Sequence, residues 1–340
     1  MKQAVMTQPG VIEYRDIARP AAGTGEVLIQ VRRIGVCGSD IHVYHGLHPY
    51  TPYPVVQGHE VSGLIAEIGA GVKGFQKGDT VTFLPQVTCG TCYPCTHGME
   101  HICESLKVMG FQTDGAGQEF FPILAEKVIK LPEKISLDEA ALVEPVSVGV
   151  HAIRRAGGVE GKNVLVLGAG TIGNLLAQSA RASGARKVML TDVSPYKLER
   201  ARQCGLDCAV NPNEVDLAQA VSGCLGPERA DVIFEAVGVE NTITNAVNIA
   251  RKGSTIVVVG VFGKKPVVDL GLVQDRELTL VGTLMYQRED YDRAIEFIAA
   301  GKMVLDPLIS SRFPFDHYLD AYHSIEAAHG NSMKVMIELG

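Results

Sequence analysis

The chain has 340 residues, of which 46% are hydrophobic and 20% charged, so an ordinary folded protein of about two domains is expected. Its net charge of −7, with no basic run, argues against nucleic acid or an anionic membrane surface as a partner. The start shows no secretory signal, and no stretch approaches the roughly 20 apolar residues of a membrane helix. We therefore expect a cytoplasmic protein with a small-molecule partner.

The first part of the chain is rich in short β-type runs broken by Gly and Pro. Apolar residues alternate or cluster over strand lengths at 26–31, 61–68 and 79–83. This pattern predicts a compact, mostly antiparallel β domain.

Two short segments of this β domain hold a candidate metal site. Cys37 opens the segment Cys-Gly-Ser-Asp-Ile-His, and His59-Glu60 follows Gly58, while Glu144 comes from a distant segment. A mixed sulfur, nitrogen and oxygen set with few fixed ligands is typical of catalytic zinc, which keeps a position for water or substrate. Such a zinc lowers the pKa of a bound alcohol. Read singly, Cys37 suits a small buried residue, His59 a structural histidine and Glu144 a helix cap.

Four cysteines form a second cluster, in which two consecutive C-x2-C steps are followed by one more cysteine: Cys89, Cys92, Cys95 and Cys103. Four thiolates saturate a zinc ion, so this site is predicted to be structural. His97 and His101 flank the cluster, and either could replace a thiolate in it. In a reducing cytosol clustered thiols are read as metal ligands. The other cysteines are expected to be small buried or half-buried residues: Cys204, Cys208 and Cys224.

From Pro145 onward, helix and strand patterns alternate. Strands are predicted at 163–167, 187–192, 230–235 and 255–259, and helices at 148–156, 173–183 and 195–204. This alternation predicts an α/β domain with a parallel sheet covered by helices on both faces. A further helix is expected at 291–300, in a tail that could be a third piece of this domain.

A glycine-rich turn marks the predicted nucleotide site. Gly168, Gly170 and Gly173 form G-x-G-x-x-G directly after a strand and at the start of a helix. Gly168 permits the tight turn, Gly170 lets the backbone approach a pyrophosphate, and Gly173 allows the helix to pack closely on the strand. A turn without a ligand has the same glycines, but the flanking β-α-β pattern and the acid that follows argue against it. A flavin could use the same fingerprint, but these glycines lie mid-chain, and zinc with NAD explains more of the sequence.

That acid is Asp192, at the end of the next strand. Its carboxylate can accept hydrogen bonds from both ribose hydroxyls and would repel a 2′-phosphate, so NAD is favoured over NADP. Lys197 either contacts the ribose or is solvated. Further cofactor contacts are predicted in the glycine-rich turn and after two later strands: Thr171, Ile172, Val237, Val259 and Gly260.

These motifs together resemble the zinc-dependent medium-chain alcohol dehydrogenases. The segment Gly58-His-Glu-Val-Ser-Gly-Leu-Ile-Ala-Glu-Ile-Gly-Ala-Gly-Val72 is similar to the zinc signature of the family. The Cys-Gly-Ser-Asp-x-His segment, the four-cysteine cluster and the glycine-rich turn follow in the family's order and spacing, so the resemblance covers essentially the whole chain. The stretch Leu142–Ala152 resembles the polyol branch, which includes sorbitol, butanediol and sugar-acid dehydrogenases.

The resemblance implies the fold and the roles of the site residues. It implies a GroES-like β domain over 1–147 and 286–340 and a Rossmann NAD domain over 148–285, in a homotetramer or homodimer. The catalytic-zinc positions are Cys37, His59 and Glu144, the last sometimes through water, and Glu60 is a ligand or near-ligand that exchanges with substrate. Ser39 would pass the proton of the zinc-bound alcohol towards the cofactor ribose and His42, while hydride moves to NAD. The four cysteines would hold the structural zinc, giving two zinc ions per chain.

One departure from the family concerns the substrate pocket. Sorbitol dehydrogenases carry an Arg-Tyr pair where this chain reads Met285-Tyr286, so a polar anchor for a long polyol is missing. Arg288 lies nearby as a carboxylate-binding alternative or a solvated residue. Sorbitol is thus disfavoured as the substrate.

We therefore predict a zinc- and NAD-dependent dehydrogenase that interconverts a secondary alcohol of a diol, polyol or sugar acid and its ketone. One alternative is an L-threonine 3-dehydrogenase-like oxidation of an amino alcohol. A zinc-independent reductase of the same fold would leave Cys37, His59 and Glu144 without a role. A non-catalytic NAD-binding protein would not need Ser39 and His42.

Overall fold

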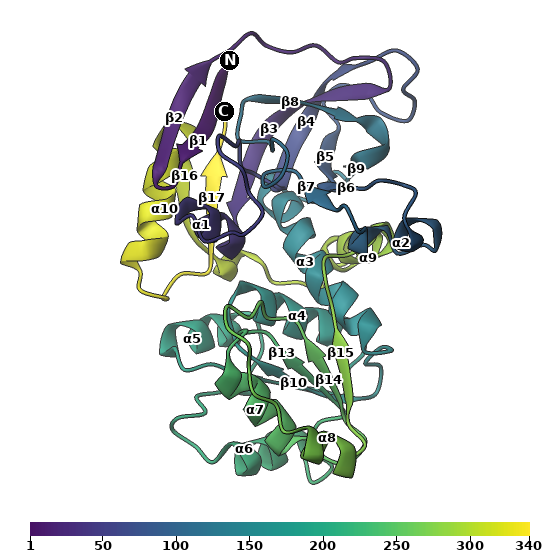
Figure 1. Ribbon diagram of the computed structural model, residues 1–340, viewed down its shortest axis with the longest axis vertical. Coiled ribbons are helices and arrows are strands. Elements are labelled where there is room, and N and C mark those ends of the chain that lie inside the picture. The colour runs from purple at the N-terminus through teal and green to yellow at the C-terminus, as the bar shows by residue number, and fades with distance from the viewer. The chain divides into compact units, whose positions relative to one another are not determined.

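The computed structural model describes all residues from Met1 to Gly340, and the chain forms two compact units (Figure 1). Unit 1 comprises Met1–Glu144 and Ile309–Gly340, and unit 2 comprises Pro145–Leu308. The domain limits expected from the sequence differ from these mainly at 286–308. This segment contains helix α9 (Arg288–Ala299), which packs on helix α4 (Thr171–Ala182) of unit 2.

Unit 1 is built on a seven-stranded sheet in which the last strands of the chain join the first. The strand order is β16-β17-β3-β4-β5-β9, and β8 pairs with β3; all pairs are antiparallel except the parallel pair β16–β17. The long central strand β3 (Glu26–Val36) pairs with β4 (Glu60–Ile68) on one side and β17 (Lys334–Glu338) on the other. Residues far apart in the sequence therefore lie side by side at the centre of this sheet.

The remaining elements of unit 1 are short. The strands are β1 (Lys2–Gln8), β2 (Val11–Asp16), β5 (Thr80–Phe83), β6 (Gln86–Val87), β7 (Lys107–Val108), β8 (Phe120–Leu124), β9 (Val128–Lys130) and β16 (Ile309–Pro314). The helices are α1 (Gly38–Tyr44), α2 (Tyr93–Thr96), α10 (Tyr318–Ala327) and the 3₁₀ turns η1 (Glu100–Ile102), η2 (Ala125–Lys127) and η4 (Phe315–His317).

Unit 2 is a six-stranded parallel sheet with the strand order β12-β11-β10-β13-β14-β15. Its strands are β10 (Asn163–Leu167), β11 (Lys187–Thr191), β12 (Ala209–Val210), β13 (Val232–Glu235), β14 (Thr255–Val258) and β15 (Thr279–Gly282). Its helices are α4, α5 (Pro195–Gln203), α6 (Leu217–Leu225), α7 (Glu240–Ile249), α8 (Leu270–Asp275) and α9, followed by η3 (Asp306–Leu308). In chain order this is the 3-2-1-4-5-6 arrangement of dinucleotide-binding folds.

The central strand β10 shows why this sheet reads as unbroken apolar runs. Val164 and Val166 belong to one core cluster, together with residues of α4, whereas Leu165 and Leu167 belong to another, together with residues of α6 and α7. Successive side chains of a strand point to opposite faces, so a strand covered on both faces needs apolar residues at every position.

Helix α3 (Leu137–Arg155) begins earlier than the sequence predicts. A helix is expected only over 148–156, whereas the observed helix also contains Pro145, a residue that disfavours a helix interior. The helix instead starts at Leu137, after Ser136 and Glu139 form reciprocal hydrogen bonds at its N-terminus. Tertiary burial of Ala140–Val143 outweighs the local cost of the proline.

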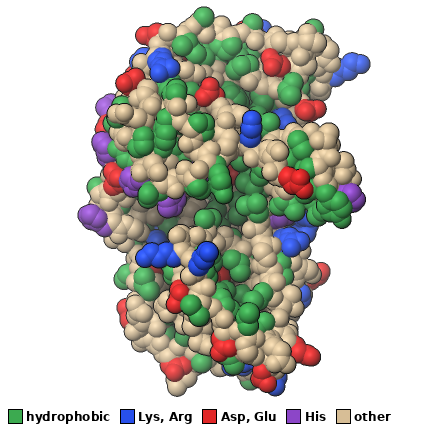
Figure 2. All heavy atoms as spheres, viewed as in Figure 1, with side chains coloured by type: hydrophobic (Ala, Val, Ile, Leu, Met, Phe, Trp, Pro, Cys, Tyr) green, Lys and Arg blue, Asp and Glu red, His purple; other side chains and the backbone are tan.

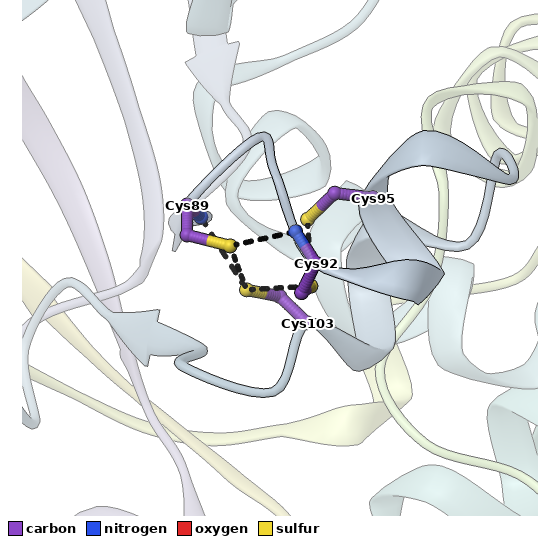
Figure 3. Close-up of side chains that lie close together, drawn as sticks. All are labelled: Cys89, Cys92, Cys95 and Cys103. Atoms are coloured by element: carbon purple, nitrogen blue, oxygen red, sulfur yellow. Dashed lines mark hydrogen bonds between the residues drawn. The ribbon is translucent and has the colours of Figure 1, made fainter.

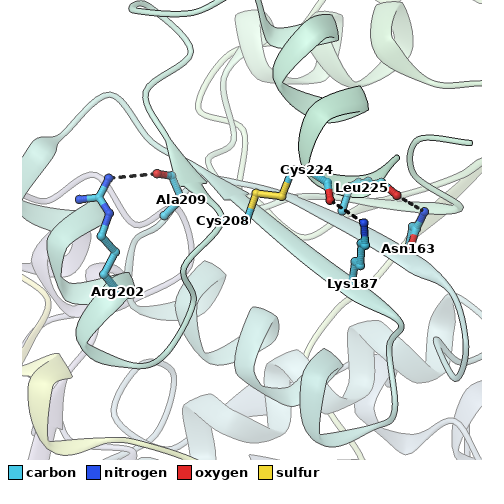
Figure 4. The surroundings of a disulfide bond; sticks show 7 residues. All are labelled: Asn163, Lys187, Arg202, Cys208, Ala209, Cys224 and Leu225. Carbon is cyan, nitrogen blue, oxygen red and sulfur yellow. Dashed lines mark hydrogen bonds between the residues drawn. A yellow bond between two sulfur atoms is a disulfide. The ribbon is translucent and has the colours of Figure 1, made fainter. Parts of the chain in front are cut away.

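The cysteines of unit 2 differ from the expectation in one respect. Cys208 and Cys224 form a disulfide, with their Cα atoms 6.4 Å apart (Figure 4). Cys208 precedes β12 and Cys224 lies near the end of α6, and the sequence gives no sign that these two elements bring the sulfurs together. Cys204 is free and buried, as expected.

Charged side chains are spread over the molecular face in Figure 2, where Lys and Arg alternate with acidic and hydrophobic residues. No helix combines the length and the apolar character that crossing a membrane requires.

Candidate active site

The candidate metal ligands of unit 1 come together at the junction of β3, α1 and β4. Cys37 directly follows β3 and caps the N-terminus of α1, and Glu60 is the first residue of β4. The antiparallel register places Gly35 opposite Glu60, so the end of β3 lies beside the start of β4. As a result one ligand atom each from Cys37, His59 and Glu60 lies within 4.8 Å of the others.

Gly35 leaves the space that the Glu60 side chain occupies. A Cβ atom on Gly35 would lie 2.1 Å from Glu60 Oε2 and 3.1 Å from its Cβ. Any larger residue at this point of β3 must displace the carboxylate, and with it one of the three clustered ligand atoms.

A buried hydrogen-bond chain supports His59. Tyr322 donates to Gln57 Oε1 at 2.8 Å, and Gln57 Nε2 donates to Asp40 Oδ1 at 3.2 Å. The same Asp40 oxygen lies 3.6 Å from His59 Nδ1, and Asp40 Oδ2 accepts the backbone N–H of Cys37 at 2.8 Å. A carboxylate on one imidazole nitrogen orients the other for a metal. None of Asp40, Gln57 and Tyr322 was expected at the site, although Asp40 lies within the Cys37–His42 segment and Gln57 directly precedes the Gly58–Val72 segment.

The donor set and its charge fit a bound cation. His59 is buried, which alone would lower its pKa, but the charges of Asp40 and the hydrogen bond of Cys37 raise the pKa to about 10. The surrounding opposite charges therefore favour a positive charge at this site despite its burial. Thiolate, imidazole and carboxylate are zinc ligands, and three of them leave a position for a further ligand.

Glu144 lies apart from this set of three. It is buried on α3 and contributes to the electrostatic environment of His59, but its carboxylate is not among the mutually close ligand atoms.

Lys334, on β17, was not expected at the site. Its ammonium donates to Glu60 Oε1 at 2.6 Å and also to Glu60 Oε2. Burial alone would lower the pKa of Lys334, but Glu60, Cys37 and Glu144 raise it. No local pattern in the sequence could have revealed this residue, because it reaches Glu60 across the intervening strand β3.

Ser39 and His42 lie on α1, next to Cys37. Residues three apart share a face of a helix, so the two side chains are neighbours. Ser39 is half-buried and His42 is exposed, so the pair leads from the region of the clustered ligands towards solvent.

The four cysteines converge in a separate lobe of unit 1 (Figure 3). The sulfur of Cys92 lies 3.4 Å from that of Cys95 and 3.8 Å from that of Cys103, and the Cys103 and Cys89 sulfurs are 3.6 Å apart. A tetrahedron with Zn–S distances of about 2.3 Å has edges of roughly 3.8 Å, so these sulfurs are spaced for zinc. His97 lies outside the set, with its ring stacked on Tyr93.

Hydrogen bonds favour a thiolate at Cys89, whereas burial raises the pKa of Cys95 to about 12. The amides of Cys92 and Ser105 donate to the sulfurs of Cys89 and Cys103, both at 3.4 Å. Hydrogen bonds from Thr91 and Cys92 lower the pKa of Cys89 to about 6. Thiolates are the form that binds metal.

The glycine-rich turn of unit 2 has the geometry that its sequence predicts. A Cβ on Gly173 would lie 1.9 Å from the carbonyl oxygen of Gly168, and Gly168 itself has a φ of +106°. Gly170 is the N-cap of α4, and a Cβ there would meet nothing within 4 Å. Gly168 and Gly173 are thus required by the protein's own packing, whereas the space at Gly170 is open to a ligand at the positive end of α4.

The other predicted cofactor residues lie at the carboxyl ends of neighbouring strands. Val237 follows β13, Val259 and Gly260 follow β14, and Thr171 and Ile172 begin α4 after β10. Lys197 is in the first turn of α5, and its amide donates to Ser194 Oγ at 3.4 Å. From β10 the chain first adds strands on one side, β11 and β12, and then on the other, β13 to β15. Parallel sheets of this kind bind dinucleotides at the carboxyl ends of the strands where that direction changes.

Asp192 is fixed in place directly after β11. Its Oδ2 accepts the amide of Ala169 at 2.8 Å and its Oδ1 accepts that of Ser194 at 2.9 Å. Each carboxylate oxygen has a second lone pair, so both can still accept a hydroxyl proton.

Replacing Asp192 by Ala is expected to raise the KM for NAD about tenfold or more, because hydrogen bonds to a charged group each contribute about 1.5–3 kcal/mol. Steady-state kinetics with NAD and NADP test this, since the KM for NADP should not rise. An equal rise for both would mean that Asp192 only supports the turn.

The segment after β15 contains Met285 and Arg288, the two residues on which the expectation about the substrate depends. Met285 has a φ of +53°, and Tyr286 is buried against Tyr291. Arg288 is exposed and pairs with Asp292 one turn along α9, at 3.0 Å. Of the two alternatives for Arg288, its position favours the solvated one.

Comparison with known proteins places the two units in one family. A family model described as an alcohol dehydrogenase GroES-like domain matches residues 23–133, and a zinc-binding dehydrogenase model matches residues 171–300. The chain is 38% identical to 2-dehydro-3-deoxy-L-galactonate 5-dehydrogenase of Pseudoalteromonas atlantica, with 96% of this chain and 95% of the relative covered. It is 34% identical to L-idonate 5-dehydrogenase of Vitis vinifera, over 94% and 90% of the two chains.

The chain belongs to the zinc-dependent medium-chain alcohol dehydrogenase superfamily.

A solved structure supports the same assignment. A protein described as a short chain alcohol dehydrogenase, from E. coli CFT073 and in complex with NADH, superposes with a TM-score of 0.90 at 29% identity, covering 100% of this chain and 99% of the other. The predictions of the polyol branch, of the two-domain GroES-like and Rossmann fold, and of a zinc- and NAD-dependent alcohol dehydrogenase are thereby confirmed.

Proposed function

We propose that this dehydrogenase interconverts a secondary alcohol of a sugar acid or related polyol and the corresponding ketone, with NAD as the hydride acceptor. The observation that carries the proposal is the buried cluster of Cys37, His59 and Glu60, whose ligand atoms lie within 4.8 Å of one another. Both sugar-acid relatives described above are 5-dehydrogenases, which supports a hydroxyl inside a carbon chain as the reacting group.

Zinc in this site would be held by Cys37, His59 and Glu60, with Glu144 nearby as a further carboxylate. When bound, it would supply a Lewis acid that favours loss of the alcohol proton near neutral pH. The Asp40 carboxylate, 3.6 Å from His59 Nδ1, would orient the imidazole for this task. A second zinc in the four-cysteine lobe would be structural, which gives two per chain.

Ser39 and His42 are proposed to carry the proton away. The Ser39 hydroxyl would accept the alcohol proton as it gives up its own, and the neighbouring His42, which is exposed, would release a proton to solvent. In unit 2 the glycine-rich turn would hold the pyrophosphate of NAD and Asp192 the ribose. We further propose a homodimer or homotetramer, as is common in the family.

The substrate is proposed to be a sugar acid rather than sorbitol. Met285 supplies no polar anchor for a long polyol, and Arg288 is already paired with Asp292. A carboxylate-bearing substrate would need another cation in the pocket.

A screen of NAD reduction over diols, alditols, aldonates and threonine, each as both enantiomers, tests this function. We expect the highest kcat/KM with an aldonate or a short polyol, and a preference for one enantiomer of at least about tenfold. If threonine were the best substrate, the amino-alcohol alternative would replace this proposal. Binding of zinc and NAD without turnover of any compound would point to a non-catalytic protein.

A further inference from the structure

His48 lies beside the candidate active site, in the loop that follows α1. Its ring stacks on that of Phe111, with the ring centroids 5.1 Å apart and an angle of 18° between the planes. Phe111 also contacts His59, whose ring centroid is 4.8 Å away. Phe111 is buried, so a single aromatic ring separates His48 from a candidate zinc ligand.

The imidazole of His48 is held in one orientation. The amides of Leu47 and His48 both donate to the carbonyl oxygen of His42, at 2.8 and 3.2 Å, which ties the loop to α1. Stacking fixes the plane of the ring, and a hydrogen bond of 2.7 Å between Nδ1 and Thr51 Oγ1 fixes its rotation within that plane. No residue of the chain hydrogen-bonds Nε2, and the side chain is half-buried, so this nitrogen is accessible to a ligand.

The charge state of His48 suits a neutral ligand group. Burial lowers the pKa of His48, and the neighbouring His42 lowers it further. A neutral imidazole donates at one nitrogen and accepts at the other. A hydroxyl group both donates and accepts, so it fits Nε2 in either tautomer, whereas a carboxylate fits only the tautomer with its hydrogen on Nε2. His48 is therefore suited to a substrate hydroxyl rather than to the role of a cation for a carboxylate.

We propose that His48 is a specificity residue, whose Nε2 hydrogen-bonds a second hydroxyl of the substrate while the reacting hydroxyl lies beside Cys37 and His59. This inference rests on the proposed function and adds the group that selects polyols and sugar acids over simple alcohols. If His48 only supported Phe111 by stacking, its loss would affect every substrate equally.

The variant His48→Phe separates these two roles, because it keeps an aromatic ring against Phe111 and removes both nitrogens. The probes are the aldonate or polyol with the highest kcat/KM in the substrate screen and its analogues that each lack one hydroxyl other than the reacting one. We expect the wild type to prefer the parent compound over one of these analogues by about tenfold or more. His48→Phe should lose that preference, because its kcat/KM falls about tenfold for the parent and stays the same for that analogue.

Comparing two compounds on the same enzyme cancels any loss of folded protein. His317→Phe is the matched control, because His317 is an exposed histidine of unit 1 that pairs with Asp320, and it should keep both kcat/KM values. An equal fall for the parent and all its analogues in His48→Phe would give His48 a structural role and overturn the inference, as would an unchanged preference. A wild type that oxidises none of the screened compounds would instead overturn the proposed function.

Discussion

Replacing Cys37 by Ser is expected to lower kcat for NADH formation by at least about 10³-fold. A Lewis acid supplies several kcal/mol of charge stabilisation, and each 1.4 kcal/mol corresponds to a factor of ten in rate. Binding of NADH, measured by the change in its fluorescence, should change little, because the glycine-rich turn lies in the other unit.

Cys204→Ser is the matched control for this prediction. Cys204 is also a free cysteine, and it is buried in unit 2, outside both clusters. The Cys204→Ser variant should retain both the bound zinc and the wild-type kcat. If Cys37→Ser kept more than about a tenth of the wild-type kcat, the Cys37 site would not be the place of the chemistry.

Replacing Cys95 by Ser is expected to disorder the four-cysteine lobe. Structural zinc binds with an apparent free energy of about 10–16 kcal/mol in zinc-finger peptides, so loss of the ion removes most of what orders so short a segment. The lobe has little apolar core of its own, because most of its residues between Cys89 and Cys103 are exposed. We expect cleavage within this segment by a non-specific protease to become at least about tenfold faster.

Glu104→Gln, an exposed change in the same lobe, should leave the cleavage rate unaltered. Zinc analysis of Cys95→Ser should show the loss of one ion per chain. Cleavage of Cys95→Ser at the wild-type rate would mean that packing, and not metal, orders the lobe.

The main features of the fold could be predicted from local patterns. The strand at 163–167 is a continuous apolar run because both faces of β10 are buried, and such a run is visible in the sequence. The start of helix α3 was not predicted, because its first turns include Pro145, which is unfavourable locally and is tolerated because neighbouring residues of the helix are buried. The Cys208–Cys224 disulfide depends on how β12 and α6 meet, which neither spacing nor composition encodes.

Some residues of the candidate site could likewise be predicted from local motifs, whereas others are brought together only by the fold. Cys37, His59 and the four cysteines could be found because each lies in a short motif with metal-ligand chemistry. Their supporting residues were harder to find: Asp40 lies inside one motif and Gln57 directly before the other, but their hydrogen bonds depend on the fold. Lys334 was out of reach altogether, since only the strand order β17-β3-β4 brings it to Glu60.

The most direct test of this account is a crystallographic zinc-edge anomalous map of the purified protein. We expect two peaks per chain in this map, one among the sulfurs of the four-cysteine lobe and one in contact with Cys37 and His59. A single peak, confined to the four cysteines of a protein that still reduces NAD, would contradict a reaction centred on the Cys37 site.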